Sequence, residues 1–333
     1  MRRCTALFLS FAIAGCSDDR ITVPSPSLVA VAPGGQADVV MAWTTLATNL
    51  SAPRFLPGVA TGPDGRVYVF GGQGGLLSTQ ATGEVYDAAT DAWSFIAPMP
   101  RRRANQAAVL GSDGRIYNVA GLVIVPPSTG NVSTTSVDVY DPATNSWTAG
   151  PSLPGVPRQN LTGTAGLDGR VYVAGGNAPT QSTGAFVFDP TTGVWTTIAP
   201  MLTPRSSFAM ATGPSGRIYA IGGTIPASPT VTATAAVEAY DPATNSWTAV
   251  ASLPGTRGMH AAATGTDGRI YVFGGTVNGG QGPTGLTDAF AYDEATNSWS
   301  PVPGPNVPRW AGRGTLGGDG RIYFVAGSLG PLA

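Results

Sequence analysis

Short runs of apolar residues recur along the chain, and a tight polar turn precedes each of them. Segments such as 67–70, 218–221 and 270–273 are apolar or aromatic throughout, and each follows an Asp-Gly-Arg or Ser-Gly-Arg triplet. Four-residue apolar runs bounded by turn residues are typical of buried β-strands. The pattern therefore predicts an all-β chain with many short strands.

One unit of about fifty residues repeats six times. The glycine of the tight turn recurs at 65, 114, 169, 216, 268 and 320. An aromatic-Asp pair precedes five of the repeated tryptophans at a fixed distance, as in Tyr86-Asp87 and Tyr140-Asp141. The repeated tryptophans lie 48 to 54 residues apart and are Trp43, Trp93, Trp147, Trp195, Trp247 and Trp299. Repetition at this period indicates a modular architecture.

Each unit divides into four predicted strands. The first is built from small residues, as in 107–110 or 261–264, and an Asp-Gly turn joins it to the second, of the type Ile-Tyr-Val-Phe. The third ends in the aromatic-Asp pair, and a Pro-Ala-Thr-Asn-Ser turn leads to the fourth, which contains the tryptophan. Four antiparallel strands repeated radially predict a β-propeller, with the small residues at its crowded axis.

The two ends of the chain are expected to share one blade. The sequence stops soon after the second strand of the sixth unit, which follows Arg321. Segments 28–32 and 39–46 are available to supply the missing third and fourth strands. We therefore predict one domain over residues 28–333, in which N-terminal outer strands join C-terminal inner strands to close six blades.

The Gly-Gly doublet, the Tyr-Asp pair and the tryptophan at these spacings resemble Kelch repeats, over roughly residues 28–333. Departures from the pattern are small: Ala120-Gly121 and Ala326-Gly327 replace the doublet, and Phe188 replaces tyrosine. The resemblance implies a propeller, and the six units imply six blades. It implies no single activity, because the Kelch family includes both binding scaffolds and enzymes.

The first residues have the pattern of a secretory signal. Arg2 and Arg3 precede an apolar stretch, and Ile13-Ala14-Gly15-Cys16 resembles a bacterial lipobox. We expect a lipoprotein signal peptide over 1–15, a lipidated Cys16, and a polar tether over 16–27. This predicts a lipid-anchored protein of the bacterial cell envelope, at the outer membrane. The alternative is an ordinary signal peptide with an incidental Cys16, and then a secreted protein.

Charge and composition narrow the range of partners. All 18 basic residues are arginine, the net charge is −1, and no basic run occurs, which argues against nucleic acid as a partner. One histidine and two cysteines exclude most metal sites that need several such ligands. We expect a monomer without metal or cofactor that contacts the membrane only through its lipid.

Two kinds of loop are predicted, on opposite faces of the propeller. The short Asp-Gly-Arg and Pro-Ala-Thr-Asn turns share one face, whereas the variable loops, such as 122–136 and 177–184, lie on the other. Variable loops on a rigid scaffold commonly carry binding sites, so the variable-loop face is the candidate binding surface.

An arginine recurs eleven residues before each turn glycine. If the six guanidinium groups lie at the channel rim on the variable-loop face, they form an anion-binding ring. The alternative is a structural role, in which they bond backbone carbonyls and acidic residues such as Glu84, Asp138 and Glu238 neutralise some of them. The six arginines are Arg54, Arg103, Arg158, Arg205, Arg257 and Arg309.

The residues that follow these arginines break the repeat. Amides and aromatics at a channel mouth suit a polar ligand with an apolar face, such as a sugar, although they could equally fill the channel. His260 is the obvious acid–base candidate, with Glu238 as a second catalytic candidate. The repeat-breaking candidates are Phe55, Asn105, Gln106, Gln159, Asn160, Phe208, Met259, His260, Trp310 and Arg313.

Two functions are consistent with these features. The first is a non-catalytic propeller that binds a protein or an anionic or polar carbohydrate, favoured because the sequence offers no cysteine nucleophile and no pair of histidines. The second is a sugar-modifying enzyme similar to Kelch-type N-acetylneuraminate epimerases, with the ring arginines on a carboxylate and His260 or Glu238 transferring protons.

Overall fold

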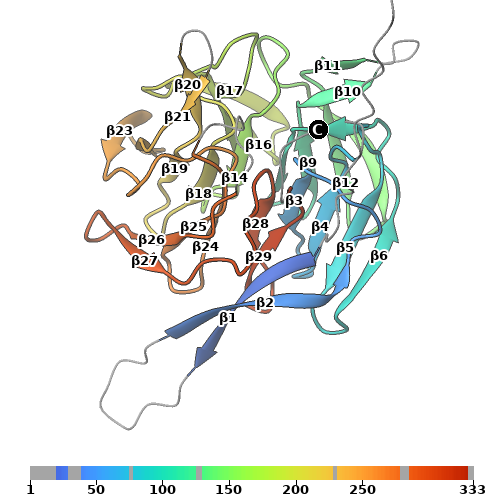
Figure 1. Ribbon diagram of the computed structural model, residues 1–333. Coiled ribbons are helices and arrows are strands. Elements are labelled where there is room, and N and C mark those ends of the chain that lie inside the picture. Colours follow the sequence, from blue (N-terminus) through green and yellow to red (C-terminus); the bar gives the residue numbers. More distant parts are fainter. Residues whose placement is uncertain are drawn as a thin grey trace, which may run out of the picture.

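A computed structural model describes residues 20–28, 39–74, 78–124, 130–227, 231–277 and 285–328 (Figure 1). Within these ranges the chain consists of β-strands, turns and loops. No helix among the described residues is long and apolar enough to cross a membrane. The expected signal peptide and Cys16 lie outside the described residues, and so does part of the expected tether.

Three four-stranded antiparallel sheets come from the first part of the chain. Sheet 1 consists of β3 (Gly58–Thr61), β4 (Val67–Phe70), β5 (Gly83–Asp87) and β6 (Ala92–Ile96). Sheet 2 consists of β8 (Ala107–Leu110), β9 (Ile116–Val119), β12 (Val137–Asp141) and β13 (Ser146–Gly150). Sheet 3 consists of β14 (Thr162–Ala165), β15 (Val171–Ala174), β16 (Ala185–Asp189) and β17 (Val194–Ile198).

Three further sheets of the same kind complete the set among the described residues. Sheet 4 consists of β18 (Ala209–Thr212), β19 (Ile218–Ile221), β22 (Val237–Asp241) and β23 (Ser246–Val250). Sheet 5 consists of β24 (Ala261–Thr264), β25 (Ile270–Phe273), β26 (Ala289–Asp293) and β27 (Ser298–Val302). Sheet 6 consists of β28 (Arg313–Leu316), β29 (Ile322–Val325), β1 (Arg20–Leu28) and β2 (Val39–Asn49).

Two small sheets extend from the variable-loop face. One contains β7 (Arg103–Ala104), β10 (Leu122–Ile124) and β11 (Asn131–Ser133), and the other contains β20 (Thr224–Pro226) and β21 (Val231–Ala233). Both are antiparallel hairpins built from loops that the sequence identifies as variable. Both lie in the upper part of Figure 1, β20 and β21 on the left and β10 and β11 on the right.

Sheet 6 combines the two ends of the chain, since β1 and β2 pair with each other and β1 pairs with β29. The third strand is Arg20–Leu28 rather than the expected segment 28–32, so most of the expected tether is strand. The pairing of β1 with its two neighbours explains why the third strand begins earlier than expected. β1 pairs with β29 at a single position, Thr22 opposite Phe324, and it pairs with β2 along most of its length.

The burial of the strands changes from the axis outward. All four residues of every second strand (β4, β9, β15, β19, β25 and β29) are buried. Outer strands such as β6 and β13 are largely exposed. The first strands contact one another in the cyclic order β3, β8, β14, β18, β24 and β28, and β28 contacts β3. In Figure 1 they surround the centre of the molecule.

The hydrophobic core lies between the sheets and is not gathered at one centre. Each of six apolar clusters joins residues of two neighbouring sheets, and one of them joins sheet 6 to sheet 1. There, the rings of Tyr86 and Tyr323 lie 5.6 Å apart. Sheets packed face to face around a common axis in this way form a β-propeller.

Five of the six repeated tryptophans donate a hydrogen bond to the segment that follows the neighbouring sheet. The indole of Trp147 donates to the carbonyl oxygen of Ala97 at 2.8 Å, and Trp247 donates equivalently to Ala199. Trp43 of sheet 6 donates to Pro303, which follows sheet 5, at 2.9 Å. The tryptophans thus add a polar link at the outer rim to the apolar contacts between sheets.

Candidate functional site

The six repeated arginines are buried inside their own sheets. Each has 4% or less of its surface exposed. In each, Nη1 donates to the carbonyl oxygen of the residue that directly follows the second strand of the same sheet. These carbonyls belong to Gly71, Ala120, Gly175, Gly222, Gly274 and Ala326. The expectation that the arginines line the channel rim is therefore corrected, since the guanidinium groups extend away from the channel along the sheets.

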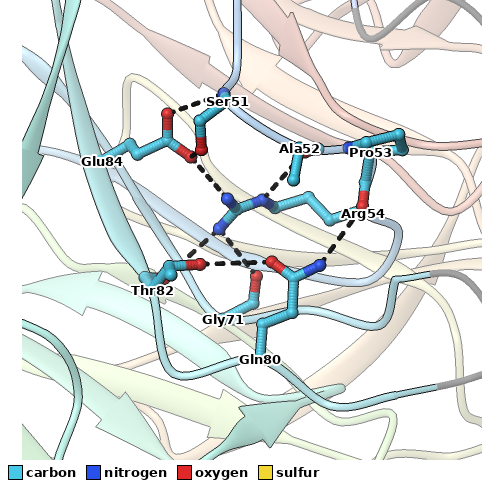
Figure 2. Close-up of polar contacts among 8 residues, drawn as sticks. All are labelled: Ser51, Ala52, Pro53, Arg54, Gly71, Gln80, Thr82 and Glu84. Atoms are coloured by element: carbon cyan, nitrogen blue, oxygen red, sulfur yellow. Dashed lines mark hydrogen bonds and ion pairs between the residues drawn. The ribbon is translucent and has the colours of Figure 1, made fainter.

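Carboxylates on the third strands neutralise three of these arginines, as Figure 2 shows for Arg54. Arg54 lies 2.5 Å from Glu84, Arg103 lies 2.6 Å from Asp138, and Arg205 lies 2.5 Å from Glu238, with both members of each pair buried. Burial lowers the pKa of Arg103 and of Arg205, and the adjacent carboxylate opposes this change. A buried charge is tolerated where a partner and hydrogen bonds satisfy it.

Two sheets replace this carboxylate with an aromatic ring. Arg158 stacks on Phe186, with its guanidinium carbon 4.8 Å from the ring centroid. Arg257 stacks on Phe290 at 5.0 Å and pairs with the half-exposed Asp288 at 2.6 Å. An aromatic face attracts a cation through its quadrupole, so the ring substitutes for part of the lost ion pair.

A closed cycle of backbone hydrogen bonds lies immediately after the arginines. The residue two positions after each arginine has a positive φ between 51° and 60°. Each amide nitrogen donates to the carbonyl oxygen of its counterpart in the preceding sheet, at 2.7–3.0 Å. We call this ring the collar; its members are Leu56, Asn105, Asn160, Ser207, Met259 and Ala311.

The remaining candidates at this end are largely engaged within the protein. Asn105 and Asn160 belong to the collar, and Gln159 forms a β-bridge with Asn177. Trp310 is fully buried and packs with Phe55 in an apolar cluster that also contains Leu56 and Ala311. Trp310 therefore fills space beside the collar and offers no surface to a ligand on the variable-loop face.

The centre of the propeller encloses a channel. Near the collar it forms a cavity of about 60 Å³, lined by Gln106, Phe208, His260 and Arg313. Beyond this, a cavity of about 290 Å³ is lined by the small residues of the first strands. Val59 and several other residues line both cavities, which are therefore parts of one channel. Of the predicted site residues, the structure brings these four together.

The two catalytic candidates do not form an acid–base pair. Burial, with contributions from Arg257 and Arg313, lowers the pKa of His260 to about 3, so its ring is neutral at physiological pH. Glu238 is buried in its ion pair with Arg205. The geometry therefore does not provide proton transfer near neutral pH by these two residues, as the epimerase hypothesis requires.

Metal-ligating side chains do not cluster in the part of the chain that the structure describes. No group of three His, Cys, Asp or Glu side chains there could hold a metal ion. Asn118, buried beside Gln106, is a polar residue that the repeat analysis did not select, although it interrupts the apolar second strand of sheet 2. This polar residue within an apolar run is the feature of the sequence that identifies Asn118.

The variable-loop face carries exposed apolar side chains that the sequence analysis did not identify. Of seven large hydrophobic residues exposed among the described residues, four lie on the hairpins and links of this face. Position within a loop gave no indication of their exposure, because neighbouring loop residues such as Leu153 are buried. The four are Val132, Val156, Leu202 and Val277.

Curated relatives match parts of the chain. A Kelch-like protein of Aspergillus terreus, terF, is 29% identical over 77% of this chain and 59% of its own length. Kelch-like protein 36 of Mus musculus is 33% identical over 67% of this chain and 35% of its own length. The chain therefore spans less than two thirds of the length of these relatives.

Solved structures show the same fold at low identity. The structure of YjhT matches with a TM-score of 0.65 and 18% identity, covering 82% of this chain and 94% of that one. A fungal alcohol oxidase of the AA5 family, in complex with copper, matches with a TM-score of 0.59 and 20% identity, covering 87% and 65%. At these identities the likeness concerns architecture alone.

The Kelch motif family model matches five successive segments: residues 55–100, 103–154, 161–202, 204–254 and 257–306. Each segment begins near one of the buried arginines or the collar and contains the repeated tryptophan of its sheet. These matches extend over more than half of the chain and coincide with the repeating structural unit. The chain belongs to the family of Kelch-repeat proteins.

Proposed function

We propose that this chain is a six-bladed, non-catalytic propeller, closed by its N-terminal outer strands, that binds a protein partner through its variable-loop face. The observation that carries the proposal is that four exposed apolar side chains lie on the hairpins and links of that face. They are Val132, Val156, Leu202 and Val277, each with 45–59% of its surface exposed. Exposed apolar groups on a rigid scaffold are typical of protein-binding surfaces.

The two hairpins add backbone groups to this surface. β11 is an edge strand of its small sheet, and β21 pairs only with β20. Edge strands present free amide and carbonyl groups, to which an extended segment of a partner can pair. Since the repeated arginines are buried inside the sheets, the face relies on apolar and backbone contacts and not on a positive ring.

We propose further that the propeller is attached to the bacterial cell envelope, at the outer membrane, by a lipid on Cys16. The supporting feature is the sequence Ile13-Ala14-Gly15-Cys16 after a positive and apolar leader. Metabolic labelling with a palmitate analogue tests this. Label should enter the wild type and not the Cys16→Ala variant, and equal labelling of both would contradict lipidation.

The binding proposal is tested by crosslinking in cells of the source organism. The double variant Val132→Asp with Val156→Asp should lose a crosslinked partner that the wild type retains. Leu167→Asp is the matched control, since Leu167 is 70% exposed in a short turn of the opposite face. Partners retained equally by all three proteins would contradict binding at the variable-loop face.

A further inference from the structure

The channel has one unmatched positive charge. Arg313 begins β28 and lines the cavity near the collar. The equivalent first positions of the other first strands hold Gly58, Ala107, Thr162, Ala209 and Ala261. A guanidinium group thus occupies a channel position that is otherwise occupied by small residues.

No carboxylate neutralises Arg313 among the described residues. Its Nη1 donates a hydrogen bond to the carbonyl oxygen of Gly312 at 3.2 Å. The residues that line the two cavities include no aspartate or glutamate. Burial lowers the pKa of Arg313 to about 10, so the group is still charged at physiological pH. Arg313 is only partly buried, so its guanidinium group is accessible from the channel, and an anion that enters the channel can pair with it.

The cavity also offers an acceptor for a hydroxyl group. The side chain of Gln106 is 1% exposed, and its Nε2 donates to the carbonyl oxygen of Phe70 at 3.0 Å. Its Oε1 has no hydrogen-bond partner in the described structure. An anion without a hydroxyl group, such as sulfate, cannot donate to this oxygen, whereas a hydroxyl group of an organic anion can.

The two ends of the channel differ. At the collar, Leu56, Asn105 and Ala311 are buried, and Asn160, Ser207 and Met259 are partly exposed. At the other end, on the face of the short turns, Ala165 is exposed and lines the larger cavity. Threonine hydroxyl groups surround this end, with Thr61 and Thr315 2.8 Å apart. The larger cavity therefore opens on the short-turn face, opposite the proposed protein-binding face, and Arg313 lines the smaller cavity at the collar end.

We infer that the channel binds a small hydroxylated carboxylate, which enters from the short-turn face and places its carboxylate on Arg313 and a hydroxyl group on Gln106. The larger cavity, lined mainly by apolar side chains and by five threonines, holds the rest of the ligand. This site is independent of the variable-loop face, so either proposal can fail without the other.

Gluconate is a suitable probe, and sorbitol is its neutral counterpart of the same chain length. Isothermal titration should show saturable binding of gluconate and none of sorbitol. Arg313→Met should weaken gluconate binding at least about tenfold, the effect of losing one charged contact, and Arg313→Lys should restore part of it. The control Arg102→Met removes an exposed arginine and should leave the affinity unchanged.

Two further measurements distinguish a ligand-binding role of Arg313 from a structural role. Without ligand, Arg313→Met should raise the melting temperature, because it removes an uncompensated charge; a lower value would assign the guanidinium a structural role and overturn the proposal. Ala165→Trp should slow gluconate association, whereas Val156→Trp on the opposite face should not. Equal affinity of wild type and Arg313→Met, absence of gluconate binding, or saturable binding of sulfate alone would each overturn the assignment.

Discussion

The amide nitrogen of Leu56 donates a hydrogen bond of 2.7 Å to the carbonyl oxygen of Ala311, near the other end of the chain. This bond completes the cycle of six that forms the collar. Each of its residues has a positive φ, and four of the six are neither glycine nor asparagine. Their backbone conformation is unfavourable locally, by about 1 kcal/mol for each residue, and the cyclic hydrogen bonding offsets it.

The interblade tryptophan bonds should contribute measurably to stability. Trp147→Phe removes the donor to Ala97, whereas Trp93→Phe removes an indole nitrogen that has no partner in the described structure. We expect Trp147→Phe to cost about 1 kcal/mol more than Trp93→Phe in the free energy of unfolding. Urea denaturation measures both. Equal losses would show that the tryptophans act through packing alone.

Removing a buried carboxylate should destabilise the protein strongly. Glu238→Gln leaves Arg205 charged and uncompensated, and we expect a loss of about 3–5 kcal/mol in the free energy of unfolding. Asp288→Asn is the matched change at Arg257, where the carboxylate is 48% exposed and Phe290 also contacts the guanidinium. Its cost should be about 1 kcal/mol or less. Similar losses in both variants, measured by denaturant unfolding, would contradict this account.

The buried His260 should make stability depend on pH. Its pKa in the folded protein is lowered to about 3, while an unfolded histidine titrates near 6.5. Between these values the unfolded chain binds a proton that the folded protein does not. The free energy of unfolding should therefore fall as pH decreases below 6.5, by up to about 1.4 kcal/mol per pH unit.

The variant His260→Phe tests this dependence, because Phe208 occupies the equivalent position in sheet 4. Denaturant unfolding between about pH 4 and 6, a range that lies between the two pKa values, should give a shallower slope for the variant than for the wild type. Parallel slopes would show that other groups account for the acid sensitivity.

Ala120 occupies the first position of the Gly-Gly doublet in sheet 2 and should be replaceable by glycine. Ala120 has a φ of 56°, where its counterparts in four other sheets are glycine. Ala120→Gly should leave stability unchanged or raise it by up to about 1 kcal/mol, since glycine adopts this conformation without strain. Ala220→Gly, at a buried strand position in β19, should instead lower stability by about 1 kcal/mol. Thermal unfolding distinguishes the two, and a loss for Ala120→Gly would contradict the strain argument.

The repeating strands could be predicted because spacing alone determines them. The turn glycine, the apolar run and Trp147 identify a sheet without knowledge of any other part of the chain. The start of β1 at Arg20 could not be predicted in this way, because a long-range pairing with β2 forms the strand and Pro24 and Pro26 suggest a linker.

Predicting the role of the arginines requires the directions of their side chains, which the spacing of residues in the sequence does not give. Arg54 and its five counterparts were correctly placed before the first strands, but their guanidinium groups follow the sheets. A signal existed, since Glu84, Asp138 and Glu238 all lie two residues before the aromatic of the third strand. Arg313 differs from them because it occupies the first position of a first strand, so its side chain remains in the channel.

Sheet 6 combines strands that lie far apart in the sequence, and this determines when the fold can be completed. β1 and β2 are synthesised first, and their partners β28 and β29 are synthesised last. Until those last strands are available, β1 lacks its neighbour β29, and the amide of Leu56 lacks the carbonyl of Ala311. Contacts between such distant segments make folding slow relative to helical proteins of similar size. Sheet 6 therefore forms only after β28 and β29 have been synthesised, and until then β1 and β29 remain without each other as partners.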